Sequence, residues 1–363
     1  MKILTVVGAR PQFVKAAVIS RLISSKYPKI HEVMVHTGQH FDKNMSDIFF
    51  QELEITKPAY FLNINSLSHG AMIGKMIVEL ERIFINEKPD CVLVYGDTNS
   101  TLAAGITAKK LNIKVAHIEA GVRNYDEMMP EESNRYLVDR LADFNFCCTE
   151  LGYLNLIEEG LNNSKLNKKN FLSGDIMYDA ALFESSKNKD LDPKCQNIID
   201  SNKDFILTTI HRASNTDSKE VLNEIMQGLN HINKIIPIIL LTHPRTKAKF
   251  NNYNLNPEFQ LFDPLGYFET LNLIKASSLV ITDSGGLVRE AYFFKKKSLL
   301  LLSNPLWPEL VSSGACINVK PGSQEIIKAF NSMQSKQVDW KENIFGDGLA
   351  GEKILEDLSK ALT

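Results

Sequence analysis

The sequence predicts an α/β protein built from two doubly wound domains, each with a parallel sheet. Its 363 residues exceed the usual size of a single domain. Short apolar runs rich in β-forming residues alternate with segments of helical periodicity, which is typical of parallel βαβ units. Polar loops follow these runs. Because such sheets bind ligands at the carboxyl ends of their strands, we expect a polar cleft there, between the two domains.

In the first half of the chain, the expected strands lie at 2–8, 31–37, 91–96, 115–120 and 144–149. The clearest helical pattern between them has its apolar residues spaced at the helical period, at Met72, Ile73, Met76, Ile77, Leu80 and Ile83. Such a stripe is typical of a helix that packs on a core. We therefore expect this helix to cover one face of the first sheet.

The polar stretch 185–204 reads as a linker or a loosely packed connection. A second alternating series follows it, with expected strands at 205–211, 236–243, 259–263, 278–283 and 298–303. This repetition of the first pattern is the reason to expect a second doubly wound domain.

Composition and charge argue against several classes of protein. The chain has 41 basic and 43 acidic residues, so its overall charge provides no attraction for nucleic acid or an anionic membrane. The apolar part of residues 1–10 is too short for a signal peptide, and a run such as 236–241 is far below the roughly 20 residues of a membrane span. The five cysteines lack metal-ligand spacing. We expect a cytoplasmic protein without a structural metal.

Polar and charged residues recur in the loops where the expected strands end. One such loop means little, but their regular recurrence indicates one ligand-binding cleft. The loops lie at 8–15, 36–42, 95–101, 117–123, 210–217, 242–246 and 282–290.

The segment TDSGG, 282–286, precedes a helical pattern. Ser284, Gly285 and Gly286 would therefore present free backbone N–H groups at a helix N-terminus, where a phosphate binds well. The simpler alternative is that Ser284 is only an N-cap and the glycines form a turn. Glu290 could accept hydrogen bonds from ribose hydroxyls, although a lone glutamate on a helix is usually solvated.

The segment GARPQ, 8–12, has one glycine where the dinucleotide fingerprint needs three, so bound NAD is not supported. Arg10 instead offers a bidentate donor for an anion. Lys15 lies about one turn into the helix after Pro11 and, if it stood alone, would be read as a surface lysine. His211 and Arg212 end the first strand of the second series. Beside a phosphate site they could clamp a diphosphate or protonate a leaving group, although a lone histidine is more often structural.

Several carboxylates are candidate acid/base groups. Asp97 follows a fully apolar strand, where it could also form an Asx turn or cap the helix that begins near Ser100. Glu119 lies two residues after His117 on an expected strand, so both should face the same side, and a buried carboxylate there is costly unless it is paired or functional. Glu131 and Glu132 follow Pro130, where acidic residues commonly complement a helix dipole.

Taken in order, these motifs resemble the non-hydrolysing UDP-N-acetylglucosamine 2-epimerase family. The resemblance covers essentially the whole chain, through GARPQFVKA, GDTNSTLA, HIEAG, MPEE, HR, HPRT, TDSGG and FGDGLA. It implies a GT-B-like fold of two Rossmann-like domains with the active site in the interdomain cleft. The expected domains are 1–175, carrying the acid/base carboxylates, and 176–345, binding UDP, with a C-terminal helix at 346–363 that returns to the first domain. The family is typically homodimeric and needs no cofactor.

The resemblance also implies a chemistry. UDP is eliminated across C1 and C2 of the sugar to give a bound 2-acetamidoglucal, and is then added back with the C2 proton delivered to the opposite face. By motif match, Asp97, Glu119 and Glu131 are the acid/base groups, while Lys15 and His211 assist the sugar and the departing diphosphate. The UDP-sugar would be bound by the remaining matched residues, Arg10, Arg212, His243, Ser284, Gly285, Gly286 and Glu290.

Departures from the best-known bacterial pattern leave the substrate open. HTGQHFD at 36–42, Ser214, the pair Val288 and Arg289, and NPLWPE at 304–309 differ from that pattern. HTGQHFD and the segment YGDTNST, 95–101, resemble relatives that act on modified UDP-2-acetamido sugars, such as UDP-2,3-diacetamido-glucuronate. The main hypothesis is a 2-epimerase of UDP-N-acetylglucosamine that serves polysaccharide synthesis. The alternatives are an epimerase of another UDP-2-acetamido sugar, a hydrolysing epimerase, a GT-B glycosyltransferase and an inactive UDP-sugar sensor.

Overall fold

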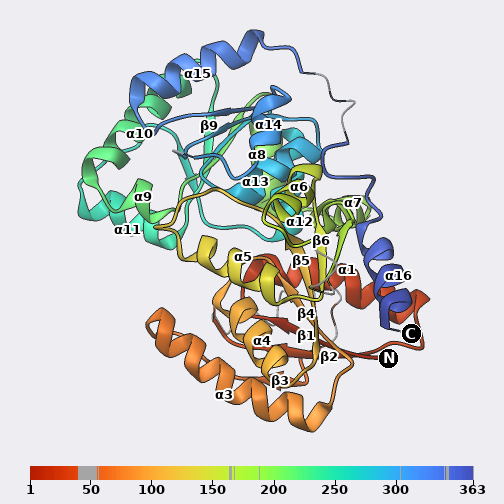
Figure 1. Cartoon of the computed structure of the whole chain (residues 1–363). Coiled ribbons are helices and arrows are strands. Elements are labelled where there is room, and N and C mark those ends of the chain that lie inside the picture. The colour runs from red at the N-terminus through yellow and green to blue at the C-terminus, as the bar shows by residue number, and fades with distance from the viewer. Residues whose placement is uncertain are drawn as a thin grey trace. The chain divides into compact units, whose positions relative to one another are not determined.

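A computed structural model describes most of the chain. It covers residues 1–39, 55, 57–162, 166, 168–187, 189–302, 304–338, 340 and 343–362. The chain forms two compact units, the first made of Met1–Ala180 with Asn343–Thr363 and the second of Ala181–Glu342 (Figure 1). Each unit is described by itself.

The first unit is built on a seven-stranded sheet in the order β3-β2-β1-β4-β5-β6-β7. Its described strands pair in parallel. They are β1 (Lys2–Val7), β2 (His31–His36), β3 (Tyr60–Phe61), β4 (Cys91–Tyr95), β5 (Lys114–Ala120), β6 (Phe144–Cys147) and β7 (Lys169–Leu172). The order reverses between β1 and β4, so the loops that follow these two strands diverge at the point where doubly wound sheets bind ligands.

Helices cover both faces of this sheet. The expected apolar stripe lies on α3 (His69–Glu87), whose Met72, Met76, Leu80 and Ile83 are buried. With α4 (Asn99–Lys110) and α5 (Pro130–Leu141), α3 packs its buried side chains against the valines of β1, β2 and β4. α1 (Arg10–Lys26) lies on the other face (Figure 1), and α6 (Glu150–Glu158) packs near β6 and β7.

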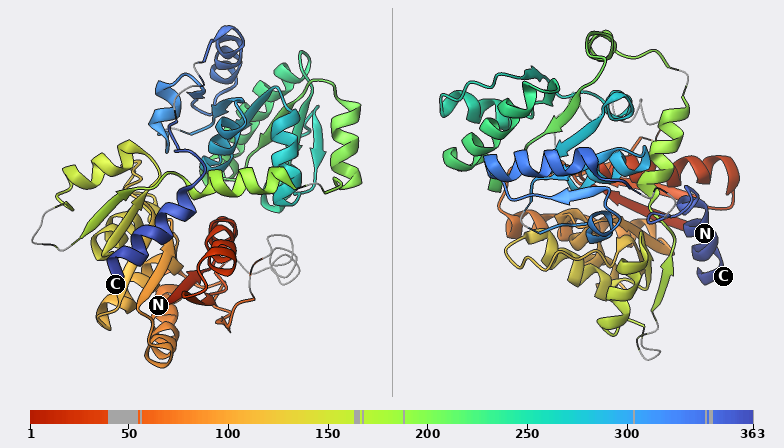
Figure 2. Two further views of the ribbon diagram at one scale, coloured as in Figure 1. Left: turned by 90° about the vertical axis from the view of Figure 1, so that its right-hand side faces the viewer. Right: turned by 90° about the horizontal axis from the view of Figure 1, so that it is seen from above.

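The end of the chain returns to the first unit as α16 (Ala350–Leu362), which packs along α1 (Figure 2). Its apolar side is buried through Ile354, Leu355 and Leu358. At its first turn, the carboxylate of Asp179, on α7 (Ile176–Ser186), accepts hydrogen bonds from the backbone N–H groups of Ala350 and Gly351 at 3.1 and 2.7 Å. The start of this helix is therefore held by a charged cap from a distant part of the sequence.

The second unit contains a six-stranded sheet in the order β10-β9-β8-β11-β12-β13, again parallel throughout its described strands. Its strands are β8 (Ile206–Thr209), β9 (Ile238–Leu241), β10 (Gln260–Phe262), β11 (Leu279–Thr282), β12 (Lys297–Leu300) and β13 (Cys316–Asn318). The order reverses between β8 and β11, so this sheet has the same kind of switch point as the first one.

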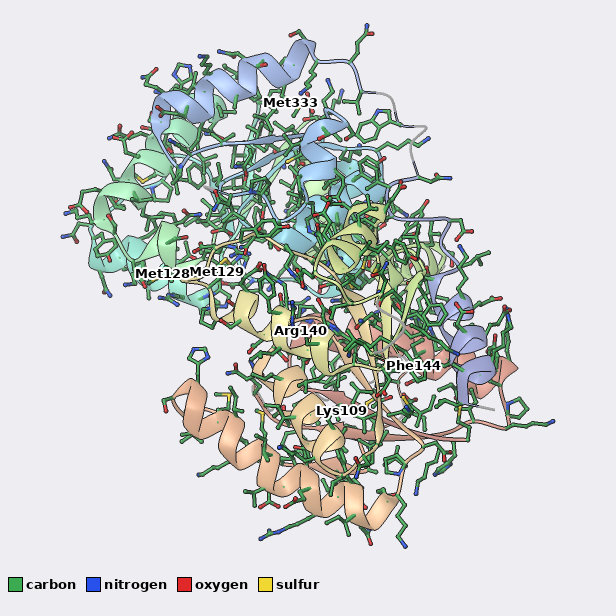
Figure 3. The ribbon with its side chains drawn as sticks, viewed as in Figure 1. Lys109, Met128, Met129, Arg140, Phe144 and Met333 are labelled. Carbon is green, nitrogen blue, oxygen red and sulfur yellow. The ribbon has the colours of Figure 1, made fainter. Side chains whose placement is uncertain are left out.

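The helices of the second unit are α8 (Pro193–Ser201), α9 (Ala213–Thr216), α10 (Lys219–Asn233), α11 (Pro244–Asn252), α12 (Tyr267–Ala276), α13 (Gly285–Phe293), α14 (Pro308–Ser312) and α15 (Ser323–Ser335). Buried side chains of α10 and α15, including Met333 (Figure 3), form one core with those of β8, β9 and β11. In the same view, Phe144 marks the start of β6 in the first unit.

The expected fold class is confirmed: both units are doubly wound α/β structures with parallel sheets. The short strands β3, β7 and β13 were not expected, and the stretch read as a linker, 185–204, contains the helix α8. None of the helices in the described ranges combines the length and the apolar character that a membrane span requires.

Candidate active site

In the first unit, Gln12 joins the ends of β1 and β4. Its Oε1 accepts hydrogen bonds from the backbone N–H groups of Gly8 and Ala9 at 2.7 and 3.1 Å. Its Nε2 donates to the carbonyl oxygen of Tyr95 at 2.7 Å. This buried amide therefore fixes the first turn of α1, which carries Arg10 and Lys15, relative to the loop that carries Asp97.

Lys15 and Glu119 form a buried ion pair. The Nζ of Lys15 lies 2.7 Å from Oε2 of Glu119, and the two side chains are 4% and 11% exposed. Lys15 is therefore not a surface lysine. Gly96 lies beside the pair, because a Cβ atom there would stand 3.4 Å from Lys15 Nζ and 3.5 Å from Glu119 Oε1. A side chain at position 96 would therefore begin in contact with both charged groups.

A bulge sets the direction of Glu119. Its φ angle is +74°, and the pairing of β5 with β6 shifts register between Ile118 and Ala120. Regular alternation through Glu119 was therefore a wrong expectation, because the extra residue re-aims the side chain. His117, expected on the same face, is instead fully buried and has both ring nitrogens 2.7 Å from an acceptor, Asp139 Oδ1 and the carbonyl oxygen of Gly96.

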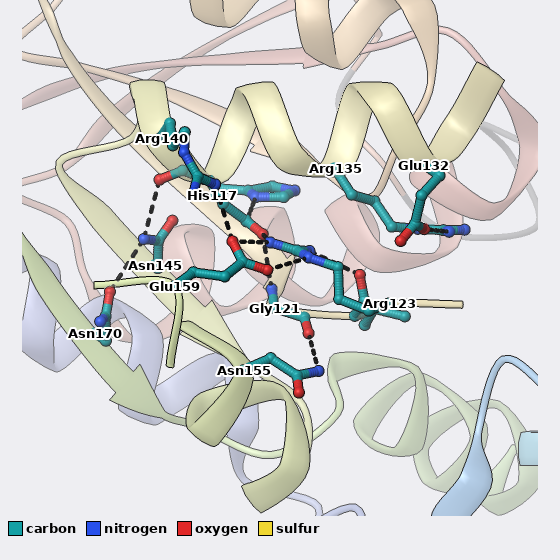
Figure 4. Close-up of polar contacts among 12 residues, drawn as sticks. His117, Gly121, Arg123, Glu132, Arg135, Arg140, Asn145, Asn155, Glu159 and Asn170 are labelled. Carbon is teal, nitrogen blue, oxygen red and sulfur yellow. Dashed lines mark hydrogen bonds and ion pairs between the residues drawn. The ribbon is translucent and has the colours of Figure 1, made fainter. Parts of the chain in front are cut away.

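Asp139 on α5 is the centre of a buried polar network. Figure 4 shows its partners His117, Gly121 and Arg123, with Glu159 beside Arg123. Besides His117, its carboxylate contacts the guanidinium of Arg123 at 2.7 Å and accepts a hydrogen bond from the backbone N–H of Gly121 at 3.1 Å. Arg123 also pairs with Glu159 at 2.7 Å. Burial by itself would raise the pKa of Asp139, but the contacts with His117 and Arg123 outweigh it and lower the pKa. The carboxylate therefore stays ionised, and it binds the ring of His117 before Glu119 and the backbone N–H of Gly121 after it.

Asp97 does not cap α4, because Thr98 is the N-cap of that helix. Instead, Oδ2 of Asp97 lies 2.5 Å from Nη2 of Arg135, whose Nη1 donates to Glu132 at 2.6 Å. Asp97 is still about a quarter exposed, at 26% of its side chain. Burial opposes the charge of Arg135, but Asp97 and Glu132 more than compensate and raise its pKa.

The two glutamates after Pro130 have different environments. Glu131 is half-buried, and its carboxylate pairs with no cation among the residues that the structure describes. Glu132 was expected to be an ordinary residue at a helix start, and that was wrong, since it is only 2% exposed. Its carboxylate accepts from the backbone N–H of Tyr125 at 3.1 Å as well as from Arg135. Glu132 therefore holds the loop that precedes α5.

Further polar groups lie near these residues. Glu119, Cys148 and Asp175 have carboxylate and thiol atoms within 4.8 Å of one another. Although these are metal-ligating types, the Lys15 ammonium already supplies a cation at Glu119, and we assign no metal to them. In the segment 36–42, burial lowers the pKa of His36 to about 4, so this ring stays neutral. Residues 40–42 of that segment lie outside the described residues.

In the second unit, Asp283 organises the end of β8. It is fully buried and accepts from the backbone N–H groups of His211 and Arg212 at 3.0 and 2.9 Å. Its carboxylate also lies 3.1 Å from Nδ1 of His211. Burial would raise the pKa of Asp283, but these contacts outweigh it and lower the pKa. The ring of His211, 42% exposed, is thus held through one nitrogen and can present the other to a ligand.

The segment TDSGG begins α13. Ser284 is its N-cap, with Oγ accepting from the backbone N–H of Leu287 at 3.3 Å, as the simpler alternative predicted. Gly285 and Gly286 form the first turn, and Gly285 accepts a hydrogen bond through its carbonyl oxygen from Nε1 of Trp307 at 3.0 Å. Glu290 is only 7% exposed, so it is not a solvated helical glutamate.

His243 is the N-cap of α11, where its Nδ1 accepts from the backbone N–H of Arg245 at 3.2 Å. Its ring centre lies 6.3 Å from that of His211. Partial burial, followed by the neighbouring His211 and Arg245, lowers the pKa of His243. A mainly neutral ring therefore stands beside the His211 site.

Each unit thus gathers part of the predicted set. The first brings Lys15 and Glu119 into contact and gives Asp97 a separate partner, whereas Arg10 begins α1. The second holds His211 and Arg212 on Asp283. Sequence reasoning missed the residues that position these groups, which are Gln12, Arg135, Asp139 and Asp283. Gln12 lies in GARPQ and Asp283 in TDSGG, so for these two the motif was the available signal, whereas Arg135 and Asp139 lie outside the motifs that were singled out.

Comparison with known proteins adds independent findings. Residues 24–359 match the family model described as UDP-N-acetylglucosamine 2-epimerase. The chain is 43% identical, over 99% of its length and 100% of the relative, to UDP-2,3-diacetamido-2,3-dideoxy-D-glucuronate 2-epimerase of Pseudomonas aeruginosa. It is 30% identical, over 99% of its length and 98% of the relative, to UDP-N-acetylglucosamine 2-epimerase of Escherichia coli.

Solved structures give the same result. The crystal structure of the Methanocaldococcus jannaschii UDP-GlcNAc 2-epimerase, in complex with UDP-GlcNAc and UDP, is similar with a TM-score of 0.90 and 39% identity, over 99% of this chain and 100% of that one. The Neisseria meningitidis enzyme bound to UDP-GlcNAc is similar with a TM-score of 0.87 and 30% identity, over 99% of this chain and 100% of that one. Fold and sequence therefore agree along the whole chain.

Proposed function

Because the chain belongs to the UDP-N-acetylglucosamine 2-epimerase family, whose members are isomerases, we propose that it interconverts UDP-N-acetylglucosamine and UDP-N-acetylmannosamine. The observation that carries this proposal is the buried pair of Lys15 and Glu119 at the carboxyl end of β5. A buried carboxylate that a lysine orients, on a strained backbone, is typical of a functional position, and such a carboxylate can transfer a proton.

The proposed reaction eliminates UDP and adds it back. A carboxylate removes the C2 proton while the C1–O bond breaks, which gives UDP and a bound 2-acetamidoglucal. UDP then adds to C1 again, and a proton returns to the opposite face of C2. The acid and base groups would be Asp97, Glu119 and Glu131, which the first unit supplies. Lys15 would stabilise charge that develops at the sugar.

The second unit would hold the nucleotide. The free N–H groups of Gly285 and Gly286 at the start of α13, with Ser284, suit a diphosphate, and Glu290 would contact the ribose. Arg212 and His243, together with Arg10 of the first unit, would contribute further contacts to the UDP-sugar. His211 is held on Asp283 with its other nitrogen available, so it would protonate the departing diphosphate.

A deuterium-exchange assay tests this function. Incubation with UDP-N-acetylglucosamine in deuterated water should yield the C2 epimer, with deuterium at C2 of both sugars. Asp97→Asn and Glu119→Gln should each lower the exchange rate by roughly 10²- to 10⁴-fold without weakening UDP binding. The exposed Glu127→Gln is the matched control and should behave as wild type. Absence of exchange with every UDP-N-acetylhexosamine would refute the proposal.

A second candidate substrate is UDP-2,3-diacetamido-2,3-dideoxy-D-glucuronate, which the Pseudomonas aeruginosa relative names. The same assay separates the two, because the true substrate exchanges at C2 with the higher kcat/KM. A hydrolysing epimerase would instead accumulate free UDP and N-acetylmannosamine.

Three further features belong to the proposal. They are a homodimer, a cytoplasmic location and a role in polysaccharide biosynthesis, and the resemblance to the family supports each of them. Light scattering of the purified protein tests the first, since a mass near 40.9 kDa would indicate a monomer.

A further inference from the structure

Asp175 is a buried carboxylate that the proposed chemistry does not use. It is 0% exposed and lies just before α7. Its Oδ1 accepts a hydrogen bond from the backbone N–H of Met177, and its own N–H donates to the carbonyl oxygen of Phe345, both at 2.9 Å. These contacts anchor Asp175 between two segments of the first unit. Its carboxylate lies within 4.8 Å of both the Glu119 carboxylate and the Cys148 thiol.

We propose that Asp175 is a positioning residue whose buried carboxylate raises the proton affinity of Glu119. This inference rests on the proposed function, in which Glu119 is an acid/base group. It adds that Glu119 titrates as one member of a pair rather than alone.

The physical reason is the repulsion between two buried carboxylates. When both are ionised this close together in a site of low polarity, one of them retains its proton to a higher pH than an isolated carboxyl group would. Water cannot screen the pair well, because Asp175 is fully buried and the Glu119 side chain is only 11% exposed. The geometry therefore makes the pair bind one proton more tightly than an isolated carboxyl group would.

The surrounding groups do not remove this effect. Lys15, from α1, lies on Oε2 of Glu119 and offsets one negative charge. Cys148, which follows β6, contributes a neutral thiol that is 2% exposed. Asp179, on α7, adds a further carboxylate: burial, with a smaller contribution from the charge of Asp175, raises its pKa to about 6. Asp175 thus has a carboxylate neighbour in both Glu119 and Asp179, and of these three described residues only Glu119 is paired with Lys15.

The raised proton affinity has a use in the reaction. When the ionised Glu119 takes a proton from C2, the C–H electron pair forms the C1–C2 double bond and UDP leaves with the C1–O pair. The charge of the Asp175 carboxylate, within 4.8 Å, then favours the protonated form of Glu119. In the reverse direction, Glu119 can give up that proton while Asp175 retains its own charge. Asp175 thereby keeps both protonation states of Glu119 accessible near neutral pH.

The pH dependence of kcat/KM for C2 exchange tests the inference. In Asp175→Asn, the repulsion is gone and Glu119 loses its proton more easily. The limb of the pH profile that reports Glu119, whether the acidic or the alkaline one, should therefore move to lower pH by about one unit, a tenfold change in proton concentration. Cys148→Ala is the matched control, because it changes the same cluster without changing its charge, and should leave both limbs in place.

UDP binding and thermal stability are measured on each variant. They distinguish structural damage from a change in the titration of Glu119. A lower kcat with unmoved limbs would show a merely structural role and would overturn the inference, as would a shift to higher pH. If wild-type protein exchanges no UDP-N-acetylhexosamine at all, the proposed function fails, and the inference is then tested by the spectroscopic measurement alone.

That measurement is the infrared difference spectrum between wild type and Glu119→Gln over a range of pH. A band of protonated carboxyl should persist to near-neutral pH in this difference, and should disappear at lower pH when both proteins also carry Asp175→Asn. If Asp175→Asn does not fold, the first difference still decides the matter, since a band that titrates like an isolated glutamate, near pH 4.3, contradicts a raised proton affinity of Glu119.

Discussion

The backbone of Glu119 has a conformation that glutamate rarely adopts. A φ of +74° costs a non-glycine residue roughly 1–2 kcal/mol. The surrounding contacts must compensate for this cost, and they are visible: Lys15 pairs with the side chain, while Asp139 accepts a hydrogen bond from Gly121, two residues later. Strain that is maintained by such contacts is typical of a functional position.

At this scale, sequence predicted the polar residues but not their partners. Lys15 and Glu119 were both candidates, yet nothing in a single sequence shows that they touch. The partners of Gln12 and Arg135 lie 83 and 38 residues away, across the sheet. Glu132 was misread because acidic residues at helix starts are usually solvated. Arg135 lies one turn further along the same helix, but only the folded chain brings the N–H of Tyr125 to Glu132 and buries the pair.

Glu131 and Glu132 provide a matched pair of substitutions. Glu132→Gln should lower the free energy of unfolding by about 3 kcal/mol. The substitution breaks a buried ion pair and removes one of the two carboxylates that pair with the buried charge of Arg135. Glu131→Gln should change it by less than about 0.5 kcal/mol, but should lower C2 exchange by roughly 10²-fold or more. Denaturant unfolding and the exchange assay measure both. Equal stability losses would contradict the assignment of separate roles.

We expect Asp283 to affect catalysis by orienting the ring of His211. Asp283→Asn removes the charge that holds the ring, so kcat should fall by roughly 10- to 100-fold. Steady-state kinetics measures this. The control is Asp217→Asn in the same unit, an exposed carboxylate paired with Arg245, which should leave kcat unchanged. A normal kcat in Asp283→Asn would show that His211 is oriented by other contacts.

At the scale of elements, α5 is the helix that positions the proposed acid/base groups. Its buried charges Glu132, Arg135 and Asp139 recur at helical spacing and anchor it to the ends of β4 and β5, so Glu131 on the same helix is held relative to Asp97. Long strands and the α3 stripe were predictable from periodicity. β3, β7 and β13 were not, because two to four residues are too few to show alternation.

Gly121, two residues after Glu119, lies in close contact with α6, so a substitution there tests how tightly these two segments pack. A Cβ atom there would stand 2.0 Å from the carbonyl oxygen of Gly152, on α6, at a φ of +78°. Gly160 has a similar φ of +76° but open space around it. Gly160→Ala should therefore cost only the backbone strain, about 1 kcal/mol, whereas Gly121→Ala should cost about 3 kcal/mol. Thermal or denaturant unfolding compares them. Equal losses would mean that α6 moves aside freely.

At the scale of the whole molecule, both sheets wind outward in both directions from a central strand, β1 in one unit and β8 in the other. The repeated alternation of strand and helix patterns made this architecture predictable. The return of the chain to the first unit was expected only from the family resemblance. Its physical basis is an apolar helix face on α16 and the cap that Asp179 provides, 171 residues earlier.

Asp179 should make the packing of α16 on the first unit sensitive to pH, because its carboxylate caps the first turn of that helix. Burial raises its pKa to about 6, although hydrogen bonds from Gly351 and Ala350 oppose the shift. The folded protein thus binds the proton more tightly than the unfolded chain, whose aspartates titrate near 3.8. The stability that this group contributes is fully present below about pH 3.8 and is lost as the pH rises through about 6.

Asp179→Asn, which does not titrate, should therefore gain stability relative to wild type between about pH 4 and about pH 7. Denaturant unfolding across this range, with hydrogen exchange of the α16 amides, measures the difference. The exposed Asp347→Asn is the control: contact with Lys353 lowers the pKa of Asp347, so the difference from wild type should stay constant above about pH 5 and change only below it. Parallel curves for wild type and Asp179→Asn would mean that Asp179 titrates alike in the folded and unfolded chain, and that its burial at the start of α16 carries no cost.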